Sequence, residues 1–235
     1  AVLLGQGVEA EGDVRGLLDL VGHDRAVEAA VRRDLLDRSG HGAEDDVHAQ
    51  LLVAAGLLAG AFEGLAGPEH RHATAGEDAL LDRRPEREMV PYCAKNGIAL
   101  LPYGVVAGGL LSDKFLDFPG EDVVLDTSSK RKYASVLGYA GGYAWYQRLL
   151  AELRRVGDKH GGATIANVAS RWVLDSNDVT PAIILGARNA NHVDDHRAMF
   201  AFELDDDDKA SIRGVLNKGK APSADCYTYE RGGPW

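Results

Sequence analysis

The chain has few cysteines, no long apolar run and no excess of basic residues. Its two cysteines, Cys93 and Cys226, form no metal-binding or redox motif, which predicts free thiols in a reducing compartment and hence a cytoplasmic protein. The longest apolar stretch, residues 51–62, is shorter than the roughly 20 residues of a membrane helix, so we expect no membrane association. The formal net charge of −10 argues against a nucleic-acid partner, because phosphates need a basic face.

The first third of the chain also lacks residue types that the rest contains. Residues 1–79 have no Lys, Tyr, Trp, Ile, Asn, Met or Cys, whereas all of these appear from residue 80 onward. The same third holds 15 acidic and 6 basic residues, which accounts for −9 of the net charge of −10. We therefore divide the chain into a segment rich in Ala, Gly and Leu, residues 1–79, and a second segment, residues 80–235.

Two origins fit the composition of residues 1–79. The favoured residue types have GC-rich codons, as in a GC-rich gene translated out of frame; the alternative is a genuine Ala/Leu-rich segment. Its valines are scattered rather than bunched into strand-like runs, so we expect the segment to be helical or disordered. His70 and His72 have no third ligand nearby, and we interpret them as part of a polar turn and expect no metal site.

From residue 80 onward, helical and strand patterns alternate. Two short apolar runs, residues 98–102 and 181–185, are typical of parallel strands buried on both faces. Helical spacing and capping residues predict helices over residues 85–95, 141–159, 165–173, 189–200 and 206–216. The alternation makes the strands parallel, and two strands cannot close a sheet, so this segment needs further strands to complete its core.

Four motifs in this segment resemble the aldo-keto reductase family, in the family's order and spacing: residues 80–86 (LLDRRPE), 97–112 (GIALLPYGVVAGGLLS), 164–174 (TIANVASRWVL) and 183–193 (IILGARNANHV). In that family they correspond to the segment after the sixth strand, the seventh strand with its loop, the penultimate helix, and the eighth strand with its phosphate loop. The resemblance implies an α/β fold in which residues 80–235 are the C-terminal half of a (β/α)8 TIM barrel. Residues 1–79 have no counterpart in it.

The resemblance implies that the cofactor is NADP(H) and that part of its site follows the seventh strand. Tyr103 matches the aromatic residue that stacks on the nicotinamide ring, a role that suits its flat face; the alternative is a core or lid tyrosine. Val106 and Gly108 match the loop over the pyrophosphate, where small residues let backbone N–H groups approach phosphate oxygens. Gly108 and Gly109 also fit an ordinary turn.

The resemblance implies an adenosine-phosphate site made of Gly186, Arg188, His192, Asp195 and His196. Arg188 would offer a planar guanidinium to a phosphate just before a helix N-terminus, which favours NADPH over NADH. A surface ion pair with Asp194 or Asp195 is the alternative for this arginine. Two positions depart from the family, since most members have Asn in place of His196 and many have Gln or Arg in place of His192.

The family reduces carbonyls with an Asp, Tyr, Lys and His tetrad from the first half of the barrel, in which Tyr is the general acid. Residues 1–79 contain neither Tyr nor Lys, and residues 73–79 lack the family's Ser-Asn-Gln stretch. We therefore expect an oxidoreductase of this family, which would act on a small-molecule aldehyde or ketone with NADP(H). We expect none of the catalytic residues in this chain, and we expect the chain to be inactive. Two alternatives stay open: a non-catalytic NADP-binding half-barrel that completes itself by self-association, and a truncated gene product without function.

Overall fold

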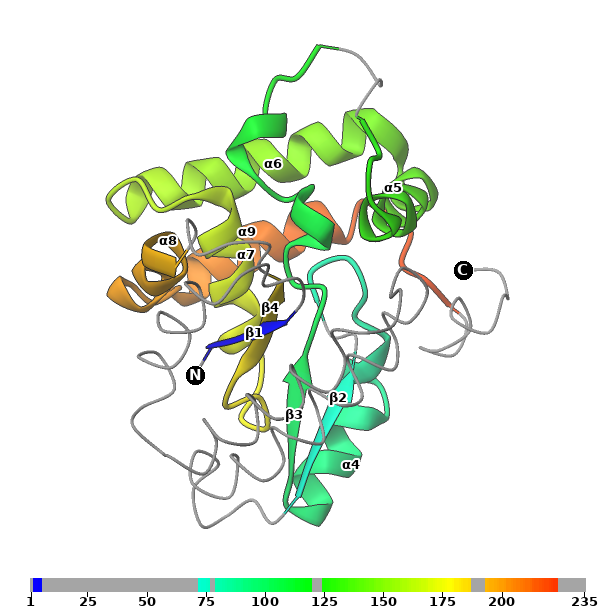
Figure 1. The fold of residues 1–235 in the computed structure, drawn as a ribbon, viewed down its shortest axis with the longest axis vertical. Coiled ribbons are helices and arrows are strands. Elements are labelled where there is room, and N and C mark those ends of the chain that lie inside the picture. Colours follow the sequence, from blue (N-terminus) through cyan, green and yellow to red (C-terminus); the bar gives the residue numbers. More distant parts are fainter. Residues whose placement is uncertain (1, 6–71, 77–78, 120–123, 187–192, 224–235) are drawn as a thin grey trace, which may run out of the picture.

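The computed structural model describes residues 2–5, 72–76, 79–119, 124–186 and 193–223 (Figure 1). Its centre contains four strands: β1 (Val2–Gly5), β2 (His72–Gly76), β3 (Ile98–Pro102) and β4 (Ile183–Gly186). β2 pairs in parallel with β3, and β1 pairs in parallel with β4. A parallel bridge between Tyr103 and Ile184 connects the two pairs, so the strands follow the order β2-β3-β4-β1 and their carboxyl ends lie at one edge.

The strands partly confirm and partly correct the prediction from the sequence. β3 and β4 are parallel, as expected, although β4 begins at Ile183 rather than at residue 181. The expectation that residues 1–79 are helical or disordered is wrong for β1 and β2, which both pair with strands of the second segment. Strand pairing uses backbone N–H and C=O groups, so a segment of weak β propensity such as β2 joins where a neighbouring strand offers an open edge. The described strands form an open array and not a closed barrel.

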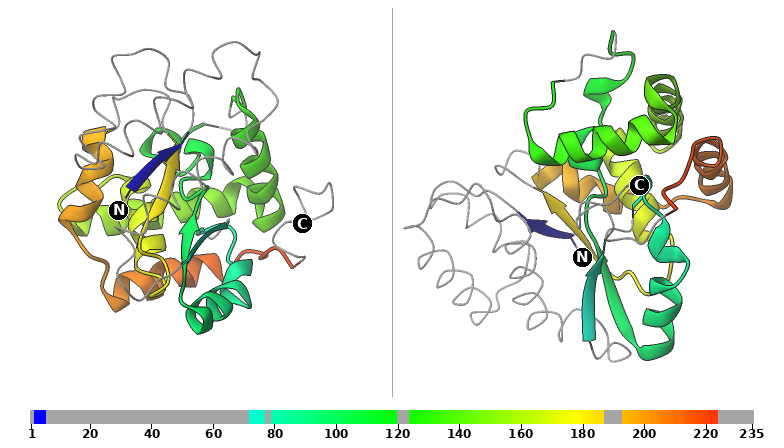
Figure 2. Two further views of the ribbon diagram at one scale, coloured as in Figure 1. Left: turned by 60° about the horizontal axis from the view of Figure 1, so that its bottom comes forward. Right: turned by 90° about the vertical axis from the view of Figure 1, so that its right-hand side faces the viewer.

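Helices follow the strands and cover them. They are, in chain order, η1 (Arg84–Glu86), α4 (Met89–Asn96), η2 (Ala107–Gly109), η3 (Asp113–Phe115), α5 (Ser128–Ala140), α6 (Gly142–Lys159), α7 (Ile165–Leu174), α8 (Val193–Ala198), η5 (Met199–Ala201) and α9 (Asp206–Leu216). Figure 2 shows α4 beside β2 and β3, with α5 and α6 at the other end of the molecule. No described helix combines the length and apolarity that crossing a bilayer requires.

The helix ends follow from particular residues. Thr164 caps α7 as predicted, since its Oγ1 accepts a hydrogen bond from the Asn167 amide at 3.2 Å. The helix expected over residues 85–95 is split into η1 and α4. At this point Asp82 and Arg84 form a buried ion pair, and Asp82 Oδ1 also accepts from the Arg84 amide at 3.1 Å, which fixes a separate turn before α4 begins.

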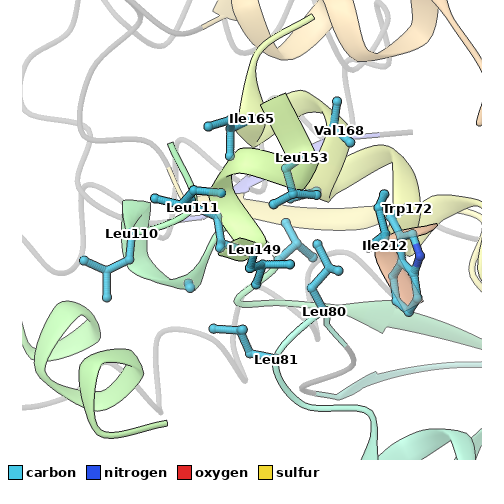
Figure 3. Packing of buried hydrophobic residues seen from close by; sticks show 14 of the residues in the cluster. Leu80, Leu81, Leu110, Leu111, Leu149, Leu153, Ile165, Val168, Trp172 and Ile212 are labelled. Atoms are coloured by element: carbon cyan, nitrogen blue, oxygen red, sulfur yellow. The ribbon is translucent and has the colours of Figure 1, made fainter. Parts of the chain in front are cut away.

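The largest cluster of buried apolar residues lies between α6, α7, α9 and the loops that follow β2 and β3 (Figure 3). α6 contributes Leu149, Leu150 and Leu153, none of which is exposed to solvent. α7 adds the helical stripe expected from the sequence, which includes Ile165, Val168 and Trp172. This packing supports the edge of the sheet where the strands end.

Candidate functional site

Tyr103 follows β3 directly and lies at the carboxyl edge of the sheet. It forms the parallel bridge to Ile184 in β4 and is half-buried. Gly186, which ends β4, is exposed at the same edge. The sheet thus places two positions predicted for a cofactor site from separate motifs, Tyr103 and Gly186, at the same edge.

The loop after β3 is a tight, glycine-rich turn. Positive φ angles occur at Gly104 (77°), Ala107 (51°), Gly108 (63°) and Gly109 (90°). The Ala107 amide donates to Gly104 O at 2.8 Å, and the Gly109 amide donates to Val106 O at 2.9 Å. Within the described part of the chain, no carbonyl or side chain accepts from the Gly108 amide. Backbone N–H groups in turns of this kind are suited to donate to anionic oxygens such as those of a phosphate.

Gly108 is also constrained by its contact with the start of α5. A Cβ at this position would lie 2.9 Å from Ser129 Cβ and 3.1 Å from the Lys130 amide nitrogen. The first turn of α5 contains no acidic residue, and Thr127 caps it by accepting from the Lys130 amide at 3.1 Å. The positive end of a helix thus lies against the loop, an arrangement that suits an anion.

Asp195 and His196 lie in α8, beside the start of α7. Asp195 Oδ1 accepts from Asn167 Nδ2 at 3.2 Å and from Thr164 Oγ1 at 3.4 Å. Both Asp195 and His196 are half-buried. The sequence pattern did not identify Asn167 as a site residue, because it is a polar position between members of the apolar stripe of α7 and belongs to no recognised site motif. Arg188 and His192 lie outside the described residues.

A cavity of about 240 Å³ lies between α5, α6 and the loop after β3. It is lined mainly by apolar residues together with two tyrosines, Tyr143 and Tyr146. Burial raises the pKa of Tyr146 well above its usual value, and the nearby Tyr143 raises it further. The Tyr146 hydroxyl donates to Leu110 O at 2.5 Å, and that of Tyr143 donates to Phe118 O. Both hydroxyl protons are therefore committed to the backbone.

The chain is similar in sequence to members of one protein family. The model of the Aldo/keto reductase family matches residues 74–217, more than half of the chain, and begins within β2 rather than at residue 80. An aryl-alcohol dehydrogenase homologue of Schizosaccharomyces pombe is 30% identical over 129 residues, which cover 55% of this chain and 36% of that protein. Flagellar radial spoke protein 5 of Chlamydomonas reinhardtii is 36% identical over 96 residues, which cover 40% of this chain and 18% of that protein.

The fold has a counterpart among solved structures. The glycerol dehydrogenase of Gluconobacter oxydans aligns with a TM-score of 0.53 and 24% identity, over 65% of this chain and 44% of the dehydrogenase. This likeness concerns the fold alone, and the chain spans less than half the length of each of these three relatives. On the match over residues 74–217, the chain belongs to the aldo/keto reductase family.

Proposed function

We propose that this chain binds NADP(H) at the carboxyl edge of its sheet, within an oxidoreductase framework that exchanges hydride between this cofactor and an aldehyde or ketone. The observation that carries the proposal is the bridge from Tyr103, directly after β3, to Ile184 in β4, which puts Tyr103 and the end of β4 at Gly186 on the same carboxyl edge. Parallel α/β sheets bind ligands at this edge, where loops and backbone amides converge. Membership of an oxidoreductase family supports the same reading.

The residues at this edge fit the parts of the cofactor. Tyr103 would present its ring to the nicotinamide, and the Gly108 amide, beside Val106, would donate to the pyrophosphate. A Cβ at Gly108 would collide with Ser129, so only glycine keeps the backbone of this turn open. Arg188, His192, Asp195 and His196 would hold the adenosine phosphate. When bound, the cofactor supplies the hydride donor or acceptor.

We also propose that these 235 residues alone do not reduce a carbonyl. Hydride delivery leaves an alkoxide that must be protonated as it forms, and a positioned acid contributes about 10²–10⁴-fold to such a step. The two tyrosines of the cavity near Leu110 donate their protons to backbone oxygens. Residues 1–79 hold no tyrosine and no lysine with which to replace them.

Calorimetric titration with NADPH tests the first half of the proposal. We expect saturable binding by the purified chain, and we expect it to weaken in Tyr103→Ala and Arg188→Ala variants. Binding that is absent in the unmodified chain would contradict the cofactor site and favour a product without function. Binding together with a concentration-dependent oligomer, measured by light scattering, would favour the half-barrel that completes itself by self-association.

NADPH oxidation at 340 nm tests the second half. The panel of carbonyls should include aryl aldehydes, because one relative is named as an aryl-alcohol dehydrogenase homologue. We expect no turnover above a no-protein control. Turnover that disappears in the Tyr103→Phe or Arg188→Ala variant would contradict the proposed inactivity and would show that a catalytic acid is supplied from elsewhere in the chain.

A further inference from the structure

Two side chains at the start of α7 hold Asp195 in α8. Asn167 Nδ2 and Thr164 Oγ1 both donate to the same carboxylate oxygen, Asp195 Oδ1, at 3.2 Å and 3.4 Å. The donors are themselves connected, because Thr164 Oγ1 accepts from the Asn167 backbone amide at 3.2 Å. One turn of α7 therefore fixes the orientation of a carboxylate on a different helix.

Asn167 occupies a position where an amide side chain has a cost. The residue is only 1% exposed, and its Oδ1 has no hydrogen-bond partner among the described residues. A buried amide oxygen without a partner loses the hydration that it has in the unfolded chain. An apolar side chain of similar size would avoid this loss, so the benefit of the amide at this position is the hydrogen bond from its Nδ2 to Asp195.

The two oxygens of this carboxylate differ in their contacts with the described residues. Both hydrogen bonds to Asp195 end on Oδ1, and Oδ2 accepts none from the described residues. Asp195 is half-buried, so part of the residue is accessible to solvent. A carboxylate oxygen held in this way accepts N–H or O–H donors, such as the amino group of an adenine or a ribose hydroxyl.

We propose that Asn167 is a positioning residue for the adenosine end of the cofactor. It holds Asp195 Oδ1 so that Oδ2 faces a donor of the adenosine moiety, and Thr164, the N-cap of α7, assists. This inference rests on the cofactor site proposed above and assigns a role to a residue of α7 that lies outside the cofactor-binding loops.

Titration with each half of the cofactor distinguishes this positioning role from a purely structural role. The full chain and its Asn167→Leu variant would be titrated with 2′,5′-ADP, which carries the adenosine half, and with reduced nicotinamide mononucleotide, which carries the other half. We expect the variant to bind 2′,5′-ADP about tenfold more weakly, since hydrogen bonds to charged groups have effects of this size or larger. We expect its affinity for the mononucleotide to stay within about twofold of that of the unmodified chain.

Asn177→Leu is the matched control. Asn177 also makes side-chain hydrogen bonds, accepting from the Val179 amide at 3.1 Å and from Thr180 Oγ1 at 2.9 Å, but it lies before β4, away from the carboxyl edge. It should reduce thermal stability without a selective loss of 2′,5′-ADP binding. In an Asp195→Asn background, adding Asn167→Leu should cause little further loss, because the two residues act through one interaction.

The outcomes are distinguishable. Equal loss of both half-cofactors in Asn167→Leu would show a structural role and overturn the inference, as would unchanged affinity for 2′,5′-ADP. An unmodified chain that binds NADPH but not 2′,5′-ADP would also overturn it. An unmodified chain that does not bind NADPH at all would contradict the proposed function and the positioning role together.

Discussion

Gly157, near the end of α6, has no room for a side chain. A Cβ there would lie 2.1 Å from Ala163 O and 2.8 Å from Arg154 Nη2. The space is occupied by the turn that leads to α7, in which the Gly162 and Ala163 amides donate to Gly157 O at 3.0 Å and 3.1 Å. A backbone oxygen held by its own turn cannot move aside as a flexible side chain can, so the connection between α6 and α7 depends on this glycine.

We predict that Gly157→Ala lowers the free energy of unfolding by about 1–3 kcal/mol, the usual cost of forcing extra atoms into a packed site. In most helix interiors the same change is favourable by about 0.5–1 kcal/mol. Urea unfolding followed by circular dichroism measures the difference. Gly214→Ala in α9 is the control, because nothing lies within 4 Å of a Cβ there, and it should not destabilise. A Gly157→Ala protein as stable as the unmodified chain would contradict the steric argument.

Cys93, in α4, is predicted to be unreactive in the folded protein. The residue is 1% exposed, and burial raises the pKa of its thiol, so little thiolate is accessible at neutral pH. A Cys226→Ser variant isolates this thiol for labelling with a chromogenic disulfide at pH 7.5. Labelling should proceed only as fast as the protein opens and should become rapid in denaturant. Immediate labelling without denaturant would show that α4 does not protect the thiol.

At the scale of elements, the start of α9 is joined to the end of α6 by charges. Lys159 Nζ lies 2.6 Å from Asp205 Oδ2 and 2.8 Å from Asp208 Oδ1, and His160 Nε2 lies 2.7 Å from Asp208 Oδ2. Asp205 and Asp208 also form a capping box, in which Asp205 Oδ1 accepts from the Asp208 amide at 2.9 Å. The same carboxylates therefore begin one helix and bind the end of another.

Because of these charges, we predict that the free energy of unfolding falls in acid. The hydrogen bond from Lys159, with that from the Asp208 amide, lowers the pKa of Asp205 from 3.8 to about 2. Because the folded pKa is the lower one, the contribution of Asp205 is complete above about pH 5 and is lost as the pH falls from about 4 to about 2. Asp205→Asn keeps a capping residue but removes the charge. Its unfolding free energy should therefore fall less than that of the unmodified chain between pH 5 and pH 3 in urea titrations. Parallel curves would contradict the assignment.

At the scale of the whole molecule, α6 connects the other helices. It contacts α5, α7 and α9, and it buries Leu149, Leu150 and Leu153 completely. Trp145, also on α6, donates from Nε1 to Val215 O of α9 at 3.1 Å. α6 is therefore central to the packing of the described core.

We predict that Leu149→Ala reduces the free energy of unfolding by about 2–5 kcal/mol, through lost apolar burial and a residual cavity. Arg148→Ala, on the exposed face of the same helix, should change it by less than about 0.5 kcal/mol. Tryptophan fluorescence and circular dichroism should report the same transition, because the buried Trp145 and Trp172 belong to the same core. A change in Leu149→Ala as small as that in Arg148→Ala would show that α6 is not central to this core.

The sequence by itself determined the elements whose signals are local. α9 spans Asp206–Leu216, as predicted, because its acidic first turn and apolar spacing both lie within the helix. Thr164 and the stripe of α7 followed in the same way, and the apolar run over residues 98–102 identified β3. Helix periodicity and capping act over a few residues, so they can be read without knowledge of the rest of the chain.

Only the tertiary structure decided how distant segments meet. β2 carries little β propensity and β1 is only four residues long, and they form through pairing with β3 and β4 respectively. The sequence does not show which edges of β3 and β4 are open to this pairing. The sequence did not predict α5, because its first turn is polar and its buried residues lie mostly in its second half. The hydrogen bond from Asn167 to Asp195 joins residues 28 positions apart. Such contacts depend on the packing of whole helices and on open backbone edges, and no local pattern of residues encodes them.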